Sequence, residues 1–180
     1  MVFNTLSPLS TPDTQDHRNL QQFLQLHLVP DTTLMLPVAQ LTEVLSIPLG
    51  QIVPIPQMPS WIMGVYNWRG QVLWLVDLGE LLGLTPWHQQ NLTTPVHRAV
   101  VLHSTPKAAS GTPSVRYTLG LVVSHIDEME WCQPSEIQSP PTSAVTPSLA
   151  PFLRGYWLNP QGKMLIVLDG EAIIAAMPKS

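Results

Sequence analysis

Short apolar runs separated by proline and glycine recur along this chain, and they predict β-strands instead of long helices. Residues 23–29 (FLQLHLV) alternate apolar and polar positions as a half-buried strand does. Pro30-Asp31 supplies a turn, and residues 32–36 form its hairpin partner. Two further apolar runs, 97–103 and 118–126, are typical of strands. The dominant predicted element is therefore the short β-strand.

The next region has two interpretations. Residues 38–47 (VAQLTEVLSI) form either a short helix, or a turn followed by a strand with Leu41, Glu43 and Leu45 on one face. Flanking prolines favour the shorter elements. Residues 52–59 contain three prolines, which exclude a central strand but suit an extended edge.

Two low-regularity segments separate the strands. Residues 104–116, rich in Pro, Ser, Gly and Ala, predict the long loop of a hairpin. Residues 133–151 contain five prolines and predict a connector without regular structure. The chain then closes on residues 171–177 (EAIIAAM), which predict a short helix.

One pattern occurs twice, about ninety residues apart. In the first copy Gly64 precedes Arg69-Gly70, the apolar run 72–76 and Asp77. In the second copy the corresponding residues are Gly155, Gln161-Gly162, 164–168 and Asp169. The repeat predicts one small β unit used twice, with a glycine turn before each apolar strand.

Each repeated strand is apolar on both faces, and each ends in an aspartate. A lone barrel with one solvated side needs only one apolar face, so the pattern predicts two packed β-barrels or a sandwich. Asp77 with Glu80 three positions later is the pattern of a capping box that opens a short helix, which Gly83 ends. We expect Asp169 to cap a helix in the same way.

Composition excludes several function classes. Only 11% of the 180 residues are charged and the net charge is −4, so no basic stripe is available for nucleic acid or an anionic membrane. The single cysteine, Cys132, excludes an internal disulfide and fits a reducing compartment. Residues 1–21 predict a disordered leader, and no apolar stretch is long enough to insert into a membrane. We expect a cytoplasmic protein.

No catalytic or metal site is predicted. Five of the histidines show none of the spacings of zinc ligands, and we expect neither a metal nor a cofactor: His27, His88, His97, His103 and His125. Asp77 and Asp169 recur as a pair, but catalytic carboxylates need to converge in one cleft, which a tandem repeat does not supply. We therefore expect no enzyme activity.

Four blocks, taken in order, carry a resemblance to a known family. Residues 64–78 (GVYNWRGQVLWLVDL) resemble the signature segment of CheW-like coupling proteins. Residues 34–45, 117–129 and 152–169 are similar to three other segments of that family. The resemblance covers about residues 22–177.

The resemblance implies an all-β fold with short helices, built from two packed, intertwined five-stranded SH3-like barrels. The single domain at 22–177 then divides into barrels at about 34–90 and 97–160, with terminal segments exchanged between them. It also implies a non-catalytic adaptor between the regulatory domain of a CheA-type histidine kinase and the cytoplasmic tip of methyl-accepting receptors. Swimming chemotaxis, twitching motility and phototaxis all remain open.

Site residues follow partly from the resemblance and partly from the residues themselves. The resemblance implies receptor contacts at Arg69, in the turn, and at Glu43, with Leu41 as its apolar neighbour. The proline-bearing edge at 47–58 blocks indiscriminate strand addition and offers apolar contacts, so we nominate it for the kinase. Its contact residues are Ile52, Val53 and Ile55. Glycines and aspartates of the repeat are expected to form turns and caps: Gly64, Gly70, Asp77, Gly155, Gly162 and Asp169.

Two other functions remain as alternatives. A small-ligand-binding β domain predicts a concave pocket with converging polar groups and perturbed titration. A self-associating structural β protein predicts concentration-dependent oligomers.

Overall fold

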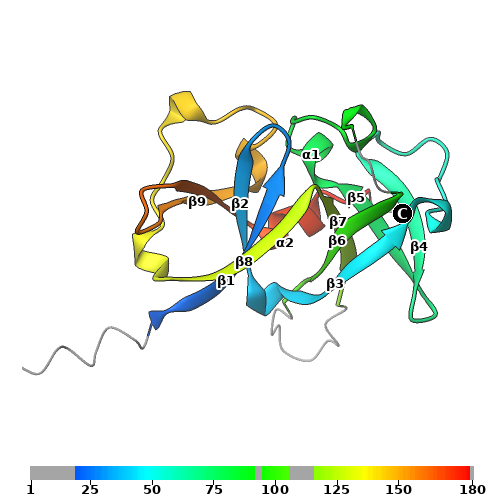
Figure 1. The fold of residues 1–180 in the computed structure, drawn as a ribbon, viewed down its shortest axis with the longest axis horizontal. Helices are drawn as coiled ribbons and strands as arrows, with labels where there is room; N and C mark the ends of the chain where they lie inside the picture. Colours follow the sequence, from blue (N-terminus) through cyan, green and yellow to red (C-terminus); the bar gives the residue numbers. More distant parts are fainter. Residues whose placement is uncertain (1–18, 92–94, 106–115, 179–180) are drawn as a thin grey trace, which may run out of the picture.

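The computed structural model describes residues 19–91, 95–105 and 116–178, which form two five-stranded sheets side by side (Figure 1). The β1 sheet has the strand order β8-β1-β2-β10-β9, and the β3 sheet has the order β3-β6-β7-β5-β4. The strands of the β1 sheet are β1 (Gln21–Leu28), β2 (Thr32–Pro37), β8 (His125–Cys132), β9 (Leu153–Leu158) and β10 (Met164–Leu168). Those of the β3 sheet are β3 (Leu41–Pro48), β4 (Ile62–Trp68), β5 (Gln71–Asp77), β6 (Val96–His103) and β7 (Thr118–Val123).

The predicted all-β class with two packed five-stranded barrels is confirmed. The hairpins of β1 with β2, β4 with β5, β6 with β7, and β9 with β10 are all antiparallel. Two short helices complete the fold, α1 (Leu78–Leu81) and α2 (Gly170–Ala175). Among the described residues, none of the helices has the length and apolar character needed to cross a membrane.

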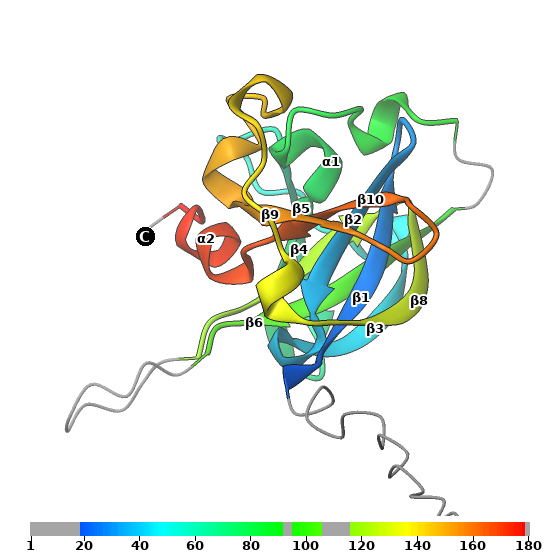
Figure 2. The same cartoon turned by 90° about the vertical axis from the view of Figure 1, so that its left-hand side faces the viewer.

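The two sheets have the same plan, offset along the chain. Each contains one parallel pair, β10 with β2 and β5 with β7, and the remaining pairs are antiparallel. The β3 sheet is built from consecutive strands, whereas the β1 sheet combines the first two strands with the last three. The chain therefore crosses between sheets after β2 and again after β7, and Figure 2 shows β1 and β8 side by side.

This grouping differs from the expected barrel boundaries of 34–90 and 97–160. Strands β6 and β7 pair with β3 and β5, so they belong to the same sheet as the strands before residue 90. Strand β2 begins before residue 34 and pairs in the other sheet. Strand pairing is set by long-range contacts, which a division by chain order does not capture.

Three apolar cores explain why the repeated strands are apolar on both faces. One core lies inside each barrel, and a third joins residues of both sheets and therefore lies between them. Strand β5 contributes Leu73 and Leu75 to its own barrel and Val76 to the central core. Strand β10 contributes Leu165 and Val167 to its barrel and Leu168 to the centre.

Both copies of the repeat use their glycines and aspartates equivalently. Gly64 and Gly155 are both buried, and in each case another segment of the chain passes close to the glycine. That segment forms a β-bridge with the residue after the glycine, Val53 with Val65 and Gln138 with Tyr156. A Cβ on Gly64 would lie 2.3 Å from the Val53 carbonyl oxygen, and one on Gly155 would lie 2.6 Å from that of Gln138. Only glycine therefore lets the backbones approach this closely.

The turns and caps of the two copies also match. Gly70 and Gly162 have φ angles of +77° and +79°, which glycine adopts without strain. Asp77 accepts from the Glu80 backbone N–H and caps α1, while Asp169 accepts from the N–H groups of Glu171 and Ala172 and caps α2. The second half of a capping box is not formed at α1, since the Asp77 N–H donates to the Trp61 carbonyl oxygen.

Several local expectations need correction. The predicted strand at 118–126 divides at Ser124, whose N–H donates to the His27 carbonyl, and β8 continues to Cys132 in the other sheet. Residues 38–47 adopt the second interpretation, a 3₁₀ turn followed by β3. Strand β1 is buried on both faces between Phe23 and Leu26, and the Nε2 of the buried Gln25 is satisfied by a hydrogen bond to Glu130 at 2.9 Å.

Boundaries shift at the chain ends and in the connector. The expected leader at 1–21 ends earlier, since β1 begins at Gln21, and residues 1–18 lie outside the described part. The connector at 133–151 contains short 3₁₀ turns and the Gln138 bridge instead of being wholly irregular. The predicted loop at 104–116 does join β6 to β7, but residues 106–115 lie outside the described part.

Candidate functional site

The fold brings Glu43 and Arg69 together although they are 26 residues apart. Glu43 lies on β3, and Arg69 lies in the turn between β4 and β5 with a φ of +54°. The Arg69 Nη2 donates to Glu43 Oε2 at 2.7 Å, and the Trp68 Nε1 donates to the other carboxylate oxygen. The guanidinium also stacks 5.3 Å from the centre of the Trp68 ring.

This Glu43–Trp68–Arg69 cluster joins the two edge strands of the β3 sheet. Edge strands β3 and β4 are not hydrogen-bonded to each other in the sheet order, so the side chains connect them. The Arg69 side chain is 68% exposed while that of Glu43 is 25% exposed. The carboxylate therefore positions the arginine, whose remaining N–H donors face solvent.

Leu41 does not lie on the face of β3 that carries Glu43. A bulge between Leu41 and Glu43 interrupts the pairing of β3 with β6. Leu41 consequently packs against the central core, whereas Leu45 packs inside the barrel of the β3 sheet. The expectation that Leu41, Glu43 and Leu45 share one face is wrong, since a bulge shifts the alternation by one residue.

The proline-bearing edge follows the outer side of β4. Both the N–H and the carbonyl of Val53 pair with Val65 at 2.9 Å, and the Val53 side chain is 59% exposed. Ile52 and Ile55 are half-buried, with Ile52 packed against the core of this barrel. Val53 is therefore the exposed apolar contact of the segment, and Ile52 anchors it.

Sequence reasoning missed a group of exposed apolar side chains at the margin between the sheets. Val44 pairs with Val100, and Met129 pairs with Leu24, so both share a face with residues of the central core. Trp131, two positions beyond Met129 on β8, shares its face. Val44, Met129 and Trp131 are 49%, 55% and 57% exposed. For Met129 and Trp131, the signal in the sequence was their alternation with acidic residues in β8.

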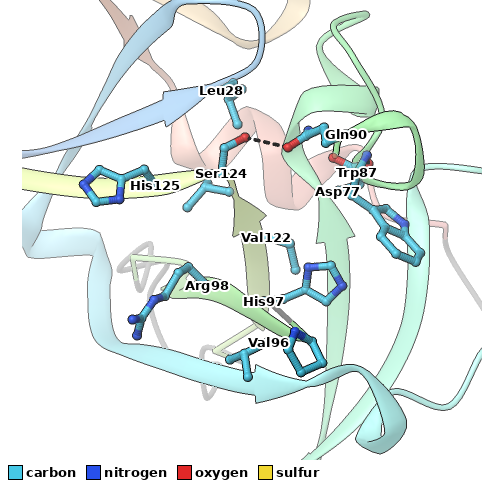
Figure 3. A pocket seen from close by; sticks show the side chains of 12 residues that line it. Leu28, Asp77, Trp87, Gln90, Val96, His97, Arg98, Val122, Ser124 and His125 are labelled. Carbon is cyan, nitrogen blue, oxygen red and sulfur yellow. Dashed lines mark hydrogen bonds between the residues drawn. The ribbon is translucent and has the colours of Figure 1, made fainter. Parts of the chain in front are cut away.

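A pocket of about 460 Å³ lies where β6 begins and β7 ends (Figure 3). Twelve residues line it: Leu28, Asp77, Trp87, Gln90, Pro95, Val96, His97, Arg98, Val122, Val123, Ser124 and His125. Figure 3 shows Arg98 and His125 on one side and His97 and Trp87 on the other, with Val122 between them. None of the residues nominated for receptor or kinase binding lines this pocket.

Asp77 and His97 are both buried here, and burial perturbs each of them. Burial raises the pKa of Asp77, although N–H groups of Trp87 and Glu80 hydrogen-bond the carboxylate and oppose the rise. Burial lowers the pKa of His97, with the Asp77 charge acting in the opposite direction. The His97 ring packs edge to face against Trp87, with 4.9 Å between the ring centres. Because burial lowers its pKa, the His97 imidazole is mainly neutral at pH 7.

Other reactive groups do not converge. Asp77 and Asp169 cap separate helices in different halves. Burial raises the pKa of the Cys132 thiol to about 11, which makes it unreactive. Within the described ranges, no group of three or more His, Cys, Asp or Glu side chains is arranged to hold a metal ion.

Comparison with known proteins gives a consistent result. The family model for the CheW-like domain matches residues 23–177. Among solved structures, the scaffolding protein TtCheW from Thermoanaerobacter tengcongensis is similar, with a TM-score of 0.63 and 21% sequence identity. The alignment covers 83% of this chain and 88% of that one. No curated protein matches the chain.

Proposed function

Because the chain belongs to the CheW-like domain family, we propose that this adaptor couples a CheA-type histidine kinase to methyl-accepting chemoreceptors. At the level of the family, the chain is a CheW-like chemotaxis coupling protein. Its action as a scaffold without catalysis belongs to the proposal. The particular partners and contact surfaces belong to the proposal. So does a cytoplasmic location, in which both partners' signalling parts are accessible.

The Glu43–Trp68–Arg69 cluster supports the proposed receptor contact. Arg69 is held by the carboxylate and the indole, so less conformational entropy is lost when it binds a partner than for a free surface arginine. Arginine is also enriched among the residues that dominate binding energy. Leu41 and exposed Val44 lie on the opposite face of β3 from Glu43, so we propose them as apolar contacts of the same strand that are separate from the cluster.

The edge formed by Ile52, Val53 and Ile55 supports the proposed kinase contact. Val53 uses its backbone groups on Val65 and leaves its side chain to solvent. Pro54 and Pro56 lack backbone N–H donors, so a partner binds apolar side chains here and cannot add a strand through a continuous row of backbone hydrogen bonds. The segment is separate from the turn that carries Arg69, as an adaptor with two partners requires.

Binding to each partner tests the proposal. The purified chain is titrated with the regulatory domain of its kinase and, separately, with a receptor hairpin fragment. We expect dissociation constants below about 100 μM, typical of transient signalling contacts. Absence of association with both partners at that concentration would end the adaptor assignment.

Variants assign the two surfaces. Arg69→Glu should weaken receptor binding at least tenfold, about 1.4 kcal/mol, and leave kinase binding unchanged. Val53→Asp should weaken kinase binding alone. Val72→Asp is the matched control for the kinase arm, because Val72 is 71% exposed and lies outside the nominated edge. Equal effects of Val53→Asp and Val72→Asp would remove Val53 from the kinase surface.

The filled core between the two sheets argues against a ligand-binding cleft between the barrels, which the alternative of a ligand-binding domain would need. Buried apolar side chains from both sheets occupy the space between the barrels, which leaves the pocket at His97 as the place to test for a ligand. For the self-associating alternative, size-exclusion chromatography across a hundredfold concentration range is the test.

A further inference from the structure

Strand β8 carries two large apolar side chains that the described residues leave uncovered. Met129 and Trp131 lie two positions apart on one face of the strand, and they are 55% and 57% exposed. Strand β8 is also the end strand of its sheet, so within the described ranges it pairs with β1 alone. Aromatic residues and Met are enriched in interaction surfaces, so this pair, the β8 strip, has the composition of such a surface.

Acidic residues of the same strand argue against a second copy of the chain as the occupant of the β8 strip. Strand β8 contains Asp127, Glu128 and Glu130 beside the apolar pair. Two β8 strands paired across a two-fold axis would bring these carboxylates close to those of the other copy. Like charges opposite each other destabilise a strand pair. The strip therefore fits an apolar segment without charged side chains.

The part of the chain that lies outside the described residues ends beside the β8 strip. Residues 1–18 are followed by β1, which begins at Gln21. The next residue, Gln22, pairs with Trp131. Paired residues of an antiparallel ladder have Cα atoms about 5 Å apart, so the N-terminal segment 1–18 joins the sheet next to Trp131. This tether gives the segment a high effective concentration at the strip.

The sequence of the N-terminal segment suits this surface. Its first part, MVFNTLSPLSTP, contains no charged side chain, so contact with the strip places no further carboxylate beside those of β8. Phe3, Leu6 and Leu9 recur every third residue, which places them on one face of a polyproline II helix. Pro8 favours that conformation. Proline-containing segments of this kind commonly dock on exposed aromatic side chains.

The N-terminal segment is also long enough to turn back over the strip. Met129, at the far end of the strip, is opposite Leu24 and therefore about 13 Å, or four strand residues, from Leu20. Leu9 precedes Leu20 by 11 residues, and that length of chain spans up to about 36 Å. Pro12-Asp13 lies between the two leucines and is a turn dipeptide, which allows the chain to reverse.

We propose that the N-terminal segment folds back onto its own β8 strip and covers Met129 and Trp131 with the side chains of Phe3, Leu6 and Leu9. The contact is intramolecular and replaces the expectation that these residues form a disordered leader. It lies on the β1 sheet, whereas the surfaces proposed for the kinase and the receptor lie at the β3 sheet. The segment therefore acts as a cover that keeps an apolar surface of the adaptor from other proteins.

The test follows Trp131 by ¹⁹F NMR in the full chain labelled with 5-fluorotryptophan. The chain has six tryptophans, and the Trp131 resonance is the one that Trp131→Phe removes. The shift of each resonance between H₂O and D₂O measures the exposure of that indole to solvent. The double variant Phe3→Asp/Leu6→Asp places two carboxylates in the apolar contact and releases the segment. The solvent isotope shift of Trp131 should then increase at least about twofold, while the other resonances stay unchanged.

The matched control is Ser7→Asp/Ser10→Asp, which adds the same charge to the same segment away from the apolar face. This variant should leave the Trp131 isotope shift unchanged, and so should tenfold dilution, because an intramolecular contact does not depend on concentration. Equal effects of the two double variants, or no effect of Phe3→Asp/Leu6→Asp, would overturn the proposal. A shift that depends on dilution would make a second copy the occupant and would overturn it too. The same holds if Trp131 becomes covered only when the kinase domain or the receptor hairpin is added. All other readings use the chain alone, so the proposal can fail while both partners still bind.

Discussion

Replacing Gly64 by alanine should destabilise the protein and disturb the kinase edge together. The new Cβ would lie 2.3 Å from the Val53 oxygen and 2.9 Å from the Pro54 Cα. These are backbone atoms, so no side-chain rotation relieves the contact. The crossing segment must move away from β4, and both Val53–Val65 backbone hydrogen bonds are lost.

The magnitude follows from two terms. Gly64 has a φ of +140°, and holding an alanine there costs about 1–3 kcal/mol. Two lost hydrogen bonds add about 0.5–1.5 kcal/mol each. The total is about 2–6 kcal/mol, which for a chain of this size lowers Tm by about 5–20 °C.

Gly70→Ala is the matched control. Gly70 also has a positive φ, +77°, but no atom lies within 4 Å of the added Cβ. We expect only the backbone strain, about 1 kcal/mol, or about 2–4 °C in Tm. Thermal unfolding by circular dichroism and kinase binding are measured for both variants. Equal Tm losses, or intact kinase binding by a folded Gly64→Ala variant, would refute the close-approach argument.

Three further outcomes are expected. Arg69→Gln should change Tm by less than about 4 °C, because an ion pair with an arginine this exposed contributes at most about 1 kcal/mol; a larger loss would make the Glu43–Arg69 pair structural. Burial holds the pKa of His97 below 6.5, so the unfolded chain binds protons first as pH falls and stability should decline below pH 6.5. The urea midpoint should therefore drop less between pH 7.5 and 5.5 in His97→Phe than in the unaltered chain, and an equal drop would contradict this. Cys132, buried and with a pKa of about 11, should resist iodoacetamide at pH 8 until the chain is unfolded; rapid native labelling would contradict its burial.

Local sequence patterns predicted much of the fold. Two-residue alternation and proline boundaries located the hairpins, and the repeated glycine-to-aspartate segment predicted the equivalent β4–β5 and β9–β10 units. Apolar character on both faces of 72–76 and 164–168 predicted two packed barrels, since each strand supplies a barrel core and the central core. These features depend on residues that are close together in the sequence, so the sequence alone predicts them.

Features that depend on contacts between distant parts of the chain could not be predicted from the sequence. The break at Ser124 carries no glycine or proline, yet the chain changes sheets there. The bulge after Leu41 turned that side chain to the opposite face. The contact between Glu43 and Arg69 depends on the approach of two edge strands, although the resemblance had nominated both residues. His97 was named only among the histidines without zinc-ligand spacing, and it is the fold that buries it against Trp87.

The central claim is that one chain holds two partners at once through separate surfaces. The most direct measurement titrates the kinase regulatory domain into the chain alone and into the chain saturated with receptor hairpin, by isothermal titration calorimetry. The account predicts a ternary complex and dissociation constants for the kinase domain that agree within about threefold, or about 0.7 kcal/mol. Displacement of the receptor fragment by the kinase domain would place both partners on one surface and contradict the account.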